Sequence, residues 1–297
     1  MHEFDFNFEF EFAPKIGFAN LAGEWVEAIL KNGPTVGLFN FQQVEYSLYL
    51  PKNRPHKHLP LLVMIHGCGQ SANSFAAGSR FNEYAERYGF AVLYPYQNNF
   101  RNMNNCWHWF NVNGRHSLEE KNSVVQIVSA LLHSCEFLDP ERVYLGGISS
   151  GAALAGVIAM DYSYLFAGLA LHSCPMFLEA RNAATAIRIM KDGYSNDIND
   201  LPVPISYVEN PLPVMIIHGE KDDYVNPINA SQLQRWFTQL NRKAARILSE
   251  RAKPVRVKIV SGLWHGWSNG DPEIRYNEAS DYDASREILK FFQLNKI

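Results

Sequence analysis

A serine between two glycines is the first residue of this chain whose surroundings point to chemistry. Residues 147–151 read Gly-Ile-Ser-Ser-Gly, which matches the pattern G-x-S-x-G, between the apolar run RVYLG and the small residues AALAGVIA. Such a strand-to-helix turn strains the serine backbone and exposes the hydroxyl, while the glycines allow close approach of neighbouring elements. We predict Ser149 as a nucleophile. The alternatives are Ser150, which breaks the spacing, and a glycine-rich turn with a capping serine.

A serine hydroxyl is a poor nucleophile without a general base, and an acid must orient that base. The segment HGEKDDYVNP follows the apolar run PVMII, and GLWHGWSNG follows VRVKIV. Because the ends of parallel strands meet at one edge of a sheet, both segments are expected to converge on the serine. We predict Asp222 as the acid, with Asp223 and Glu220 as alternatives, and His265 as the base, with a surface loop histidine as its alternative.

Three other histidines, His66, His172 and His218, end or follow apolar runs. We interpret them as hydrogen-bonded structural groups. The ten histidines are scattered, and the chain has no G-x-G-x-x-G, no Walker lysine and no H-E-x-x-H. The prediction is therefore an enzyme without a metal or another cofactor.

Acyl transfer also requires N–H donors for the oxyanion. One is expected from the residue after the nucleophile, Ser150. The other is expected from the loop HGCGQ at residues 66–70, where we choose the backbone of Cys68. Cys68 as a nucleophile is the weaker interpretation, because no base is assigned to its thiol.

Tryptophans gather in two short segments, CWHWF with Trp107 and Trp109, and GLWHGWSNG with Trp264 and Trp267. Large rigid aromatic rings near a reactive serine would form an apolar cleft. We predict Trp107 and Trp267 as substrate-binding residues. The alternative for each ring is ordinary packing in the core.

The elements that must position these residues alternate along the chain. Continuous apolar runs such as LPLLVMI suit strands buried on both faces of a parallel sheet. The predicted strands cover 41–51, 59–67, 90–97, 142–147, 166–173, 213–219 and 255–262. The predicted helices cover 74–89, 117–138, 150–160, 183–193, 228–248 and 285–294. This alternation, with the chain order Ser, Asp, His, predicts an α/β-hydrolase fold, a mostly parallel sheet with helices on both faces.

We expect residues 1–297 to form a single catalytic domain, with an N-terminal extension over 1–40 and a small lid-like insertion over 175–211. In the extension, phenylalanines alternate with mostly acidic or polar residues, which is typical of an edge strand. These residues are Phe4, Phe6, Phe8, Phe10 and Phe12. A strand that binds a partner or a second copy is the alternative.

Composition excludes several function classes. The 297 residues are 47% hydrophobic, and 27 basic residues against 30 acidic ones give a net charge of -3, so nucleic acid is not an expected partner. No apolar stretch is long enough to span a membrane. The start, MHEFDF, lacks the basic and apolar regions of a secretory signal, which predicts a cytoplasmic protein, or a secreted one if the N-terminus was trimmed.

The four cysteines, Cys68, Cys106, Cys135 and Cys174, form no CxxC pair. Free buried thiols are the simplest interpretation, and one or two disulfides are the alternative.

Several segments together resemble the polyhydroxybutyrate depolymerase family of esterases, which is close to the feruloyl and acetylxylan esterases. The resemblance covers roughly residues 45–270 and rests on IHGCGQSANSFA, CWHWF, RVYLGGISSGAALAGVIA, HGEKDDYVNP and GLWHGWSNG. It implies Ser149, Asp222 and His265 as a catalytic triad and Cys68 in the oxyanion loop. It also implies that Cys68 and Cys106 lie near each other, and a disulfide between them is a hypothesis.

This sequence departs from the family pattern at three positions around the presumed cleft. Gly69 stands where threonine is common, His108 replaces an asparagine, and Trp264 precedes the catalytic histidine. These departures affect the substrate more than the chemistry. We expect an esterase acting on poly- or oligo(3-hydroxybutyrate). A feruloyl or acetylxylan-type carbohydrate esterase is the first alternative, and a non-catalytic binding module on the same scaffold is the second.

Overall fold

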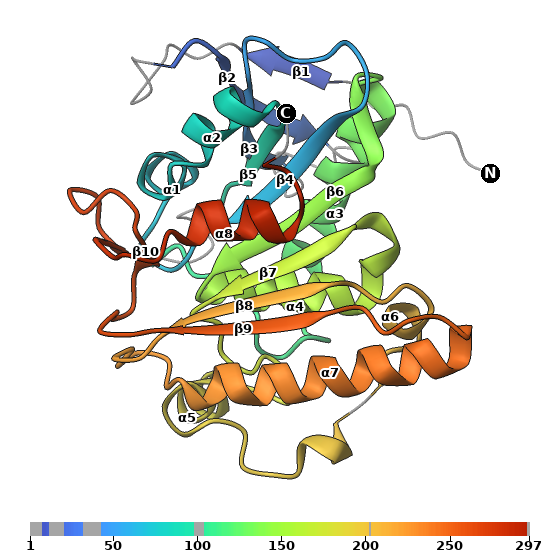
Figure 1. Cartoon of the computed structure of the whole chain (residues 1–297), viewed down its shortest axis with the longest axis vertical. Helices are drawn as coiled ribbons and strands as arrows, with labels where there is room; N and C mark the ends of the chain where they lie inside the picture. Colours follow the sequence, from blue (N-terminus) through green and yellow to red (C-terminus); the bar gives the residue numbers. More distant parts are fainter. Residues whose placement is uncertain (1–7, 12–20, 32–42, 98–103, 202, 296–297) are drawn as a thin grey trace, which may run out of the picture.

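The computed structural model describes residues 8–11, 21–31, 43–97, 104–201 and 203–295. Its centre is a nine-stranded sheet with the order β1-β2-β3-β5-β4-β6-β7-β8-β9 (Figure 1). The strands are β1 (Phe8–Glu11), β2 (Glu24–Lys31), β3 (Gln43–Leu50), β4 (Leu59–Ile65), β5 (Ala91–Pro95), β6 (Leu138–Ile148), β7 (Gly168–His172), β8 (Val214–Gly219) and β9 (Val255–Val260).

Helices cover both faces of this sheet. They are α1 (Ala72–Ser79), α2 (Phe81–Tyr88), α3 (Arg115–Ser134), α4 (Ser150–Tyr162), α5 (Ala183–Asp192), α6 (Ile205–Glu209), α7 (Ile228–Leu248) and α8 (Ala284–Phe291), with short 3-10 turns η1 (Ser163–Leu165) and η2 (Ile198–Asp200). In Figure 1, α8 lies in front of the sheet and α4 lies behind it.

Strand β4 shows how one apolar run serves two cores. All seven of its residues are buried. Leu61, Val63 and Ile65 belong to the cluster that includes α3, α4 and α7. Leu62 and Met64 belong to the cluster that includes α1, α2 and α8. Because successive side chains point to opposite faces, a continuous apolar strand is required wherever helices cover both sides.

The strands from β5 through β9 pair in parallel, whereas β1, β2 and β3 pair antiparallel at one edge. The predicted α/β-hydrolase fold, a mostly parallel sheet with helices on both faces, is confirmed. Among the described helices, none has both the length and the apolarity needed to cross a bilayer.

Among the differences from the sequence-based expectation, two concern the N-terminal half of the fold. The helix predicted over 74–89 is two helices, because Arg80 takes a left-handed conformation (φ 62°) and turns the chain between α1 and α2. Strand β2 was not predicted, since EWVEAILK shows no clean alternation of apolar and polar residues. It joins β3 to the edge strand β1.

Within the predicted Phe-rich strand, residues 8–11 form β1 at the edge of the sheet, paired with β2. Phe4, Phe6 and Phe12 lie outside the described residues.

Candidate active site

Ser149 occupies the turn between β6 and α4. Its φ of 56° and ψ of -121° are unusual for a residue with a side chain, and its N–H donates to the carbonyl of His172 at 2.9 Å. The strained turn places the serine at the carboxyl end of β6 and directly before the N-terminus of α4. This is the geometry that the G-x-S-x-G pattern predicts.

The two glycines of the pattern are required by close backbone contacts. A Cβ on Gly147 would lie 2.5 Å from the carbonyl oxygen of Ile65. A Cβ on Gly151 would lie 2.2 Å from the carbonyl oxygen of His66 and 2.3 Å from that of Ile65. Any side chain at either position would therefore force β4 away from the start of α4 and shift the serine.

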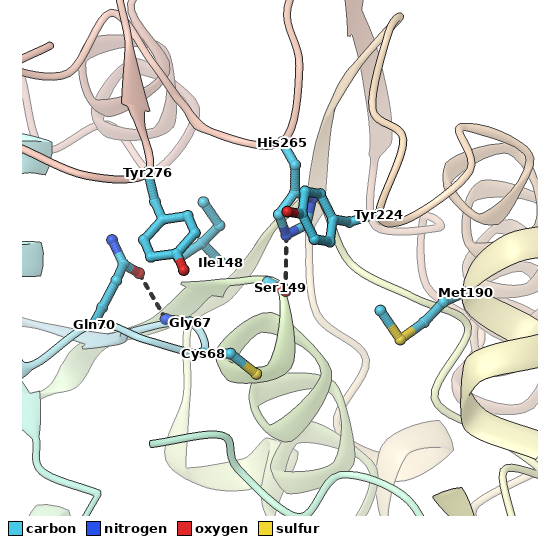
Figure 2. Close-up of a pocket in the computed structure, with 9 residues that line it drawn as sticks. All are labelled: Gly67, Cys68, Gln70, Ile148, Ser149, Met190, Tyr224, His265 and Tyr276. Atoms are coloured by element: carbon cyan, nitrogen blue, oxygen red, sulfur yellow. Dashed lines mark hydrogen bonds between the residues drawn. The ribbon is translucent and has the colours of Figure 1, made fainter. Parts of the chain in front are cut away.

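Three side chains far apart in the sequence meet at this turn. Oγ of Ser149 lies 3.0 Å from Nε2 of His265 (Figure 2). Nδ1 of the same ring lies 2.7 Å from Oδ2 of Asp222. With Nδ1 donating to the carboxylate, Nε2 is left as the acceptor for the serine hydroxyl. The arrangement matches the geometry of a nucleophile, a base and an orienting acid.

The alternative acids lie elsewhere. The carboxylate of Glu220 accepts hydrogen bonds from the hydroxyl of Ser261 and the N–H of Gly262. Asp223 is exposed, and its backbone carbonyl accepts from the ammonium group of Lys191 at 2.8 Å. Neither carboxylate hydrogen-bonds to His265, whereas that of Asp222 does.

The Asp222 carboxylate is buried and held by several donors. Oδ1 accepts from the N–H groups of Tyr224 at 3.1 Å and Val225 at 2.8 Å, and Oδ2 lies 3.3 Å from Nε2 of His218. Burial alone raises the pKa of Asp222, but the hydrogen bonds from His218, His265 and Val225 outweigh it. The net pKa lies well below its ordinary value, so this group is a stable anion beside the imidazole.

His66 and His172 are buried in the neutral form. Burial lowers the pKa of His66 to about 4, although a hydrogen bond to the carbonyl of Gly67 opposes the shift. Burial also lowers the pKa of His172 to about 3, and repulsion from His218 and His265 adds to it. Nδ1 of His172 lies 3.2 Å from the hydroxyl of Ser173. These contacts agree with the structural role predicted for both rings.

The loop after β4 faces Ser149. In this loop, the N–H of Gly67 donates to Oε1 of Gln70, that of Gly69 to the carbonyl of Asn104, and that of Gln70 to the carbonyl of Gly67. The N–H of Cys68 has no acceptor among the described residues. It is thus the one amide of these four that remains free to bind an oxyanion.

A disulfide joins Cys68 to Cys106, with 4.2 Å between the two Cα atoms. The pairing implied by the family resemblance is therefore confirmed, while Cys135 and Cys174 are free. The hydroxyl of Ser150 lies 3.3 Å from Sγ of Cys68. The disulfide thus connects the loop opposite Ser149 to the segment that carries Trp107.

A cavity of about 120 Å³ opens at Ser149 (Figure 2). Its lining residues come from six separate segments of the chain: Gly67, Cys68, Gln70, Ile148, Ser149, Met190, Tyr224, His265 and Tyr276. Met190 belongs to α5, within the predicted insertion. This insertion is tied to the loop of the acid, because the N–H of Asn226 donates to the carbonyl of Met190 at 2.7 Å. It forms one wall of the cavity.

The structure places Trp107 and Trp267, the predicted substrate-binding residues, in the core and away from the lining of the cavity. Trp107 is buried beside His66, and its indole N–H donates to the carbonyl of that residue at 2.9 Å. Trp267 is fully buried, stacks on His172 and donates to the hydroxyl of Ser285 at 2.9 Å. Packing in the core and partners for both N–H groups account for the two rings, and neither lines the cavity.

The rings that do line the cavity, Tyr224 and Tyr276, were not identified from the sequence. Tyr224 is 59% exposed and lies with its ring centre 5.2 Å from that of His265. Tyr276 follows a loop after the short strand β10 (Trp267–Ser268), at the start of β11 (Asn277–Glu278). Neither residue belongs to an apolar periodic pattern. Only the unusual Gly69 offered a signal, because Tyr276 lies against it.

Within the described part of the chain, no group of three or more His, Cys, Asp or Glu side chains is arranged to hold a metal ion.

Comparison with known proteins places this geometry in a family. The family described as esterase PHB depolymerase matches residues 44–260. A poly(3-hydroxyalkanoate) depolymerase C from Paucimonas lemoignei is 30% identical over 64% of this chain and 47% of its own length. A feruloyl esterase B from Neurospora crassa is 29% identical over 68% of this chain and 72% of its own length. The chain thus spans about half the length of the depolymerase.

A solved structure shares the fold. An acetyl xylan esterase from Aspergillus awamori superimposes with a TM-score of 0.57 at 18% identity, over 90% of this chain and 99% of the other.

Proposed function

The chain belongs to the PHB depolymerase family of esterases, and from that premise we propose that it hydrolyses carboxylic esters by acyl transfer to Ser149. The observation that supports this most directly is the continuous contact from the serine hydroxyl through His265 to Asp222, with distances of 3.0 Å and 2.7 Å. The described residues act in this proposal as one catalytic domain, with the insertion at 175–211 as a wall of its site.

In the first step, Oγ of Ser149 attacks the ester carbonyl carbon while Nε2 of His265 takes the hydroxyl proton. Asp222 holds the ring in the required tautomer and stabilises the positive charge that the ring acquires. The tetrahedral intermediate then collapses, the bond to the leaving alcohol breaks, and His265 gives its proton to that alcohol. An acyl-enzyme ester on Ser149 remains.

In the second step, His265 removes a proton from water, the resulting hydroxide attacks the acyl carbon, and Ser149 leaves with the proton returned by His265. Both steps develop negative charge on the carbonyl oxygen. The N–H groups of Cys68 and Ser150 are proposed to bind it, because the first has no other acceptor among the described residues and the second begins a helix.

The test is Ser149→Ala on a short p-nitrophenyl ester. Hydrolysis should fall by more than about 10⁴-fold, while the circular dichroism spectrum and the unfolding midpoint stay close to those of the wild type. A fluorophosphonate probe should label the wild type at Ser149 and leave the variant unlabelled. Retained hydrolysis in the variant would refute the assignment of the nucleophile and, with it, the proposed mechanism.

For the substrate, we propose esters of hydroxyalkanoic acids, as oligomers or polymer. Support comes from the family assignment and from the name of the depolymerase relative. A feruloyl or acetyl ester of a carbohydrate is the second candidate, supported by the relative named feruloyl esterase. Turnover of hydroxybutyrate oligomers, compared with that of feruloyl and acetyl sugar esters at equal concentrations, distinguishes the two. Faster release from the sugar esters would reject the first candidate.

For the compartment, the Cys68–Cys106 disulfide supports an oxidising environment rather than the cytoplasm expected from the first residues. Disulfides persist mainly in oxidising environments. We therefore place the working protein in an oxidising compartment. Thiol labelling of the protein in intact cells tests this, since two free thiols rather than four are expected.

A further inference from the structure

One side of the cavity carries two polar groups with unused hydrogen-bonding capacity. Figure 2 shows Gln70 and Tyr276 on one side of Ser149 and Met190 on the other. An acyl group bound to Ser149 must lie between these walls or leave the cavity. The chemistry of the polar side therefore bears on which acyl groups the site accepts.

Gln70 is held through its backbone and its side-chain oxygen, whereas its side-chain nitrogen takes no part. The residue is 3% exposed. Its Oε1 accepts from the N–H of Gly67 at 2.8 Å, and its backbone carbonyl accepts from Nδ2 of Asn105 at 3.1 Å. The amide nitrogen Nε2 is buried and has no partner among the described residues. An unpaired buried donor is unfavourable, so a ligand that accepts from this nitrogen gains affinity.

Tyr276 is fixed by its backbone. It has a positive φ of 63°, and its carbonyl accepts from the N–H of Trp267 at 2.7 Å, next to the pairing of β10 with β11. Its hydroxyl oxygen accepts from the guanidinium of Arg275 at 3.1 Å. The proton of that hydroxyl has no acceptor among the described residues. It is thus a second available donor.

Gly69 makes room for this hydroxyl. A Cβ at position 69 would lie 2.7 Å from Oη of Tyr276, and the backbone there has a φ of 72°, which also favours glycine. Gly69 is therefore matched to a tyrosine more than two hundred residues later in the chain. The pair places a phenol against the oxyanion loop.

From these contacts we propose that Nε2 of Gln70 and Oη of Tyr276 form a polar subsite that binds an oxygen atom carried on the acyl chain. Both groups donate, so the ligand atom is an acceptor: a hydroxyl oxygen or the carbonyl of a second ester. A plain alkanoyl chain leaves both donors unpaired and is bound less well. The inference rests on the proposed function, because it assumes that acyl groups reach Ser149.

The experiment compares two p-nitrophenyl esters that differ by one hydroxyl, 3-hydroxybutyrate and butyrate. The readout is the ratio of their kcat/KM values, which cancels effects common to both esters. Tyr276→Phe removes only the hydroxyl, and the ratio should fall by about three- to tenfold, the value of one neutral hydrogen bond. Gln70→Met also loosens Gly67 and slows both esters, and its ratio should fall by a similar factor.

Tyr164→Phe is the matched control. Tyr164 is 60% exposed and lies in η1, beyond the far end of α4 from Ser149, so its ratio should equal that of the wild type.

A ratio unchanged in both Tyr276→Phe and Gln70→Met overturns the subsite, and so does a wild type that prefers butyrate. In either case, hydrolysis that depends on Ser149 leaves the proposed function intact. If the wild type hydrolyses neither ester and no serine is labelled by fluorophosphonate, the proposed function fails, and the subsite fails with it.

Discussion

The catalytic triad and the residues that line the rest of the cavity are held in place in different ways. In the triad, Asp222 accepts hydrogen bonds from two backbone N–H groups of its own loop and lies against His218 and His265. Most of these contacts come from residues within one short segment, so a local motif encodes them. Here, sequence and site geometry agree residue by residue.

Gln70, Met190 and Tyr276 line other sides of the cavity, and they come from two loops and a helix with no common motif. Each is positioned by a contact that crosses the fold, as Tyr276 is by Gly69. The comparison shows that each catalytic group lies in a motif that the sequence reveals, whereas the residues that line the rest of the cavity are brought there by packing. Substitutions in the triad should therefore change the rate for every ester. Substitutions of the other residues that line the cavity should change the preference among esters.

The largest effect is expected from a substitution in the triad. Asp222→Asn keeps the shape but removes the charge that fixes the imidazole tautomer, so kcat should fall by about 10³- to 10⁴-fold for every ester. Steady-state kinetics on p-nitrophenyl butyrate measure it. Asp223→Asn is the matched control, and a comparable loss in that variant would contradict the assignment of the acid.

The next prediction distinguishes an aromatic ring that stabilises the fold from one that lines the cavity. Trp267 is fully buried behind the cavity, and Trp267→Ala should lower the free energy of unfolding by about 3–5 kcal/mol, measured in urea. Tyr224 lines the cavity and is 59% exposed. Tyr224→Ala should therefore change KM while the urea midpoint hardly moves. A Trp267→Ala variant with an altered KM and an unchanged free energy of unfolding would show that Trp267 contacts substrate.

The disulfide links the oxyanion loop to the segment after residue 103, and breaking it should affect both stability and rate. Cys106→Ser opens a loop with a separation of 38 residues and should lower the free energy of unfolding by about 2–4 kcal/mol. It also frees the Cys68 amide to move, so kcat should fall by about 10- to 100-fold. Cys135→Ser, which removes a free thiol, should do neither. Equal activity in both variants would show that the loop holds its position without the bond.

The most gradual effect concerns pH. The pKa values of His66 and His172, lowered by burial to about 4 and about 3, mean that the unfolded chain binds more protons between these values and about 6.5. Stability is fully present above about pH 6.5 and falls as the pH is lowered, by about 1.4 kcal/mol per pH unit for each histidine. Urea unfolding at pH 7, 6 and 5 measures the slope. His172→Gln should make it shallower, and an unchanged slope would rule out that ring as a source.

The order of apolar runs and motifs along the chain is sufficient to predict the fold class and the three groups of the triad. Continuous apolar runs specify strands that are buried on both faces, and the motifs at Ser149 and Asp222 follow such runs directly. The motif at His265 follows the edge strand β9, in which apolar and basic residues alternate. Since parallel strands end at one edge, the order of motifs along the chain is enough to predict that they meet. The same reasoning could not distinguish one helix from two at Arg80, because a single left-handed residue leaves no periodic signal.

Which aromatic rings face the cavity depends on contacts between distant parts of the fold. His265 and Trp267 are two residues apart, yet the imidazole meets Ser149 while the indole packs on His172 and bonds to Ser285. The direction of a side chain in a loop depends on the partners that the rest of the fold supplies, and these partners are distant in sequence. For the same physical reason, Tyr276 could be placed against Gly69 only once the fold had brought the two loops together.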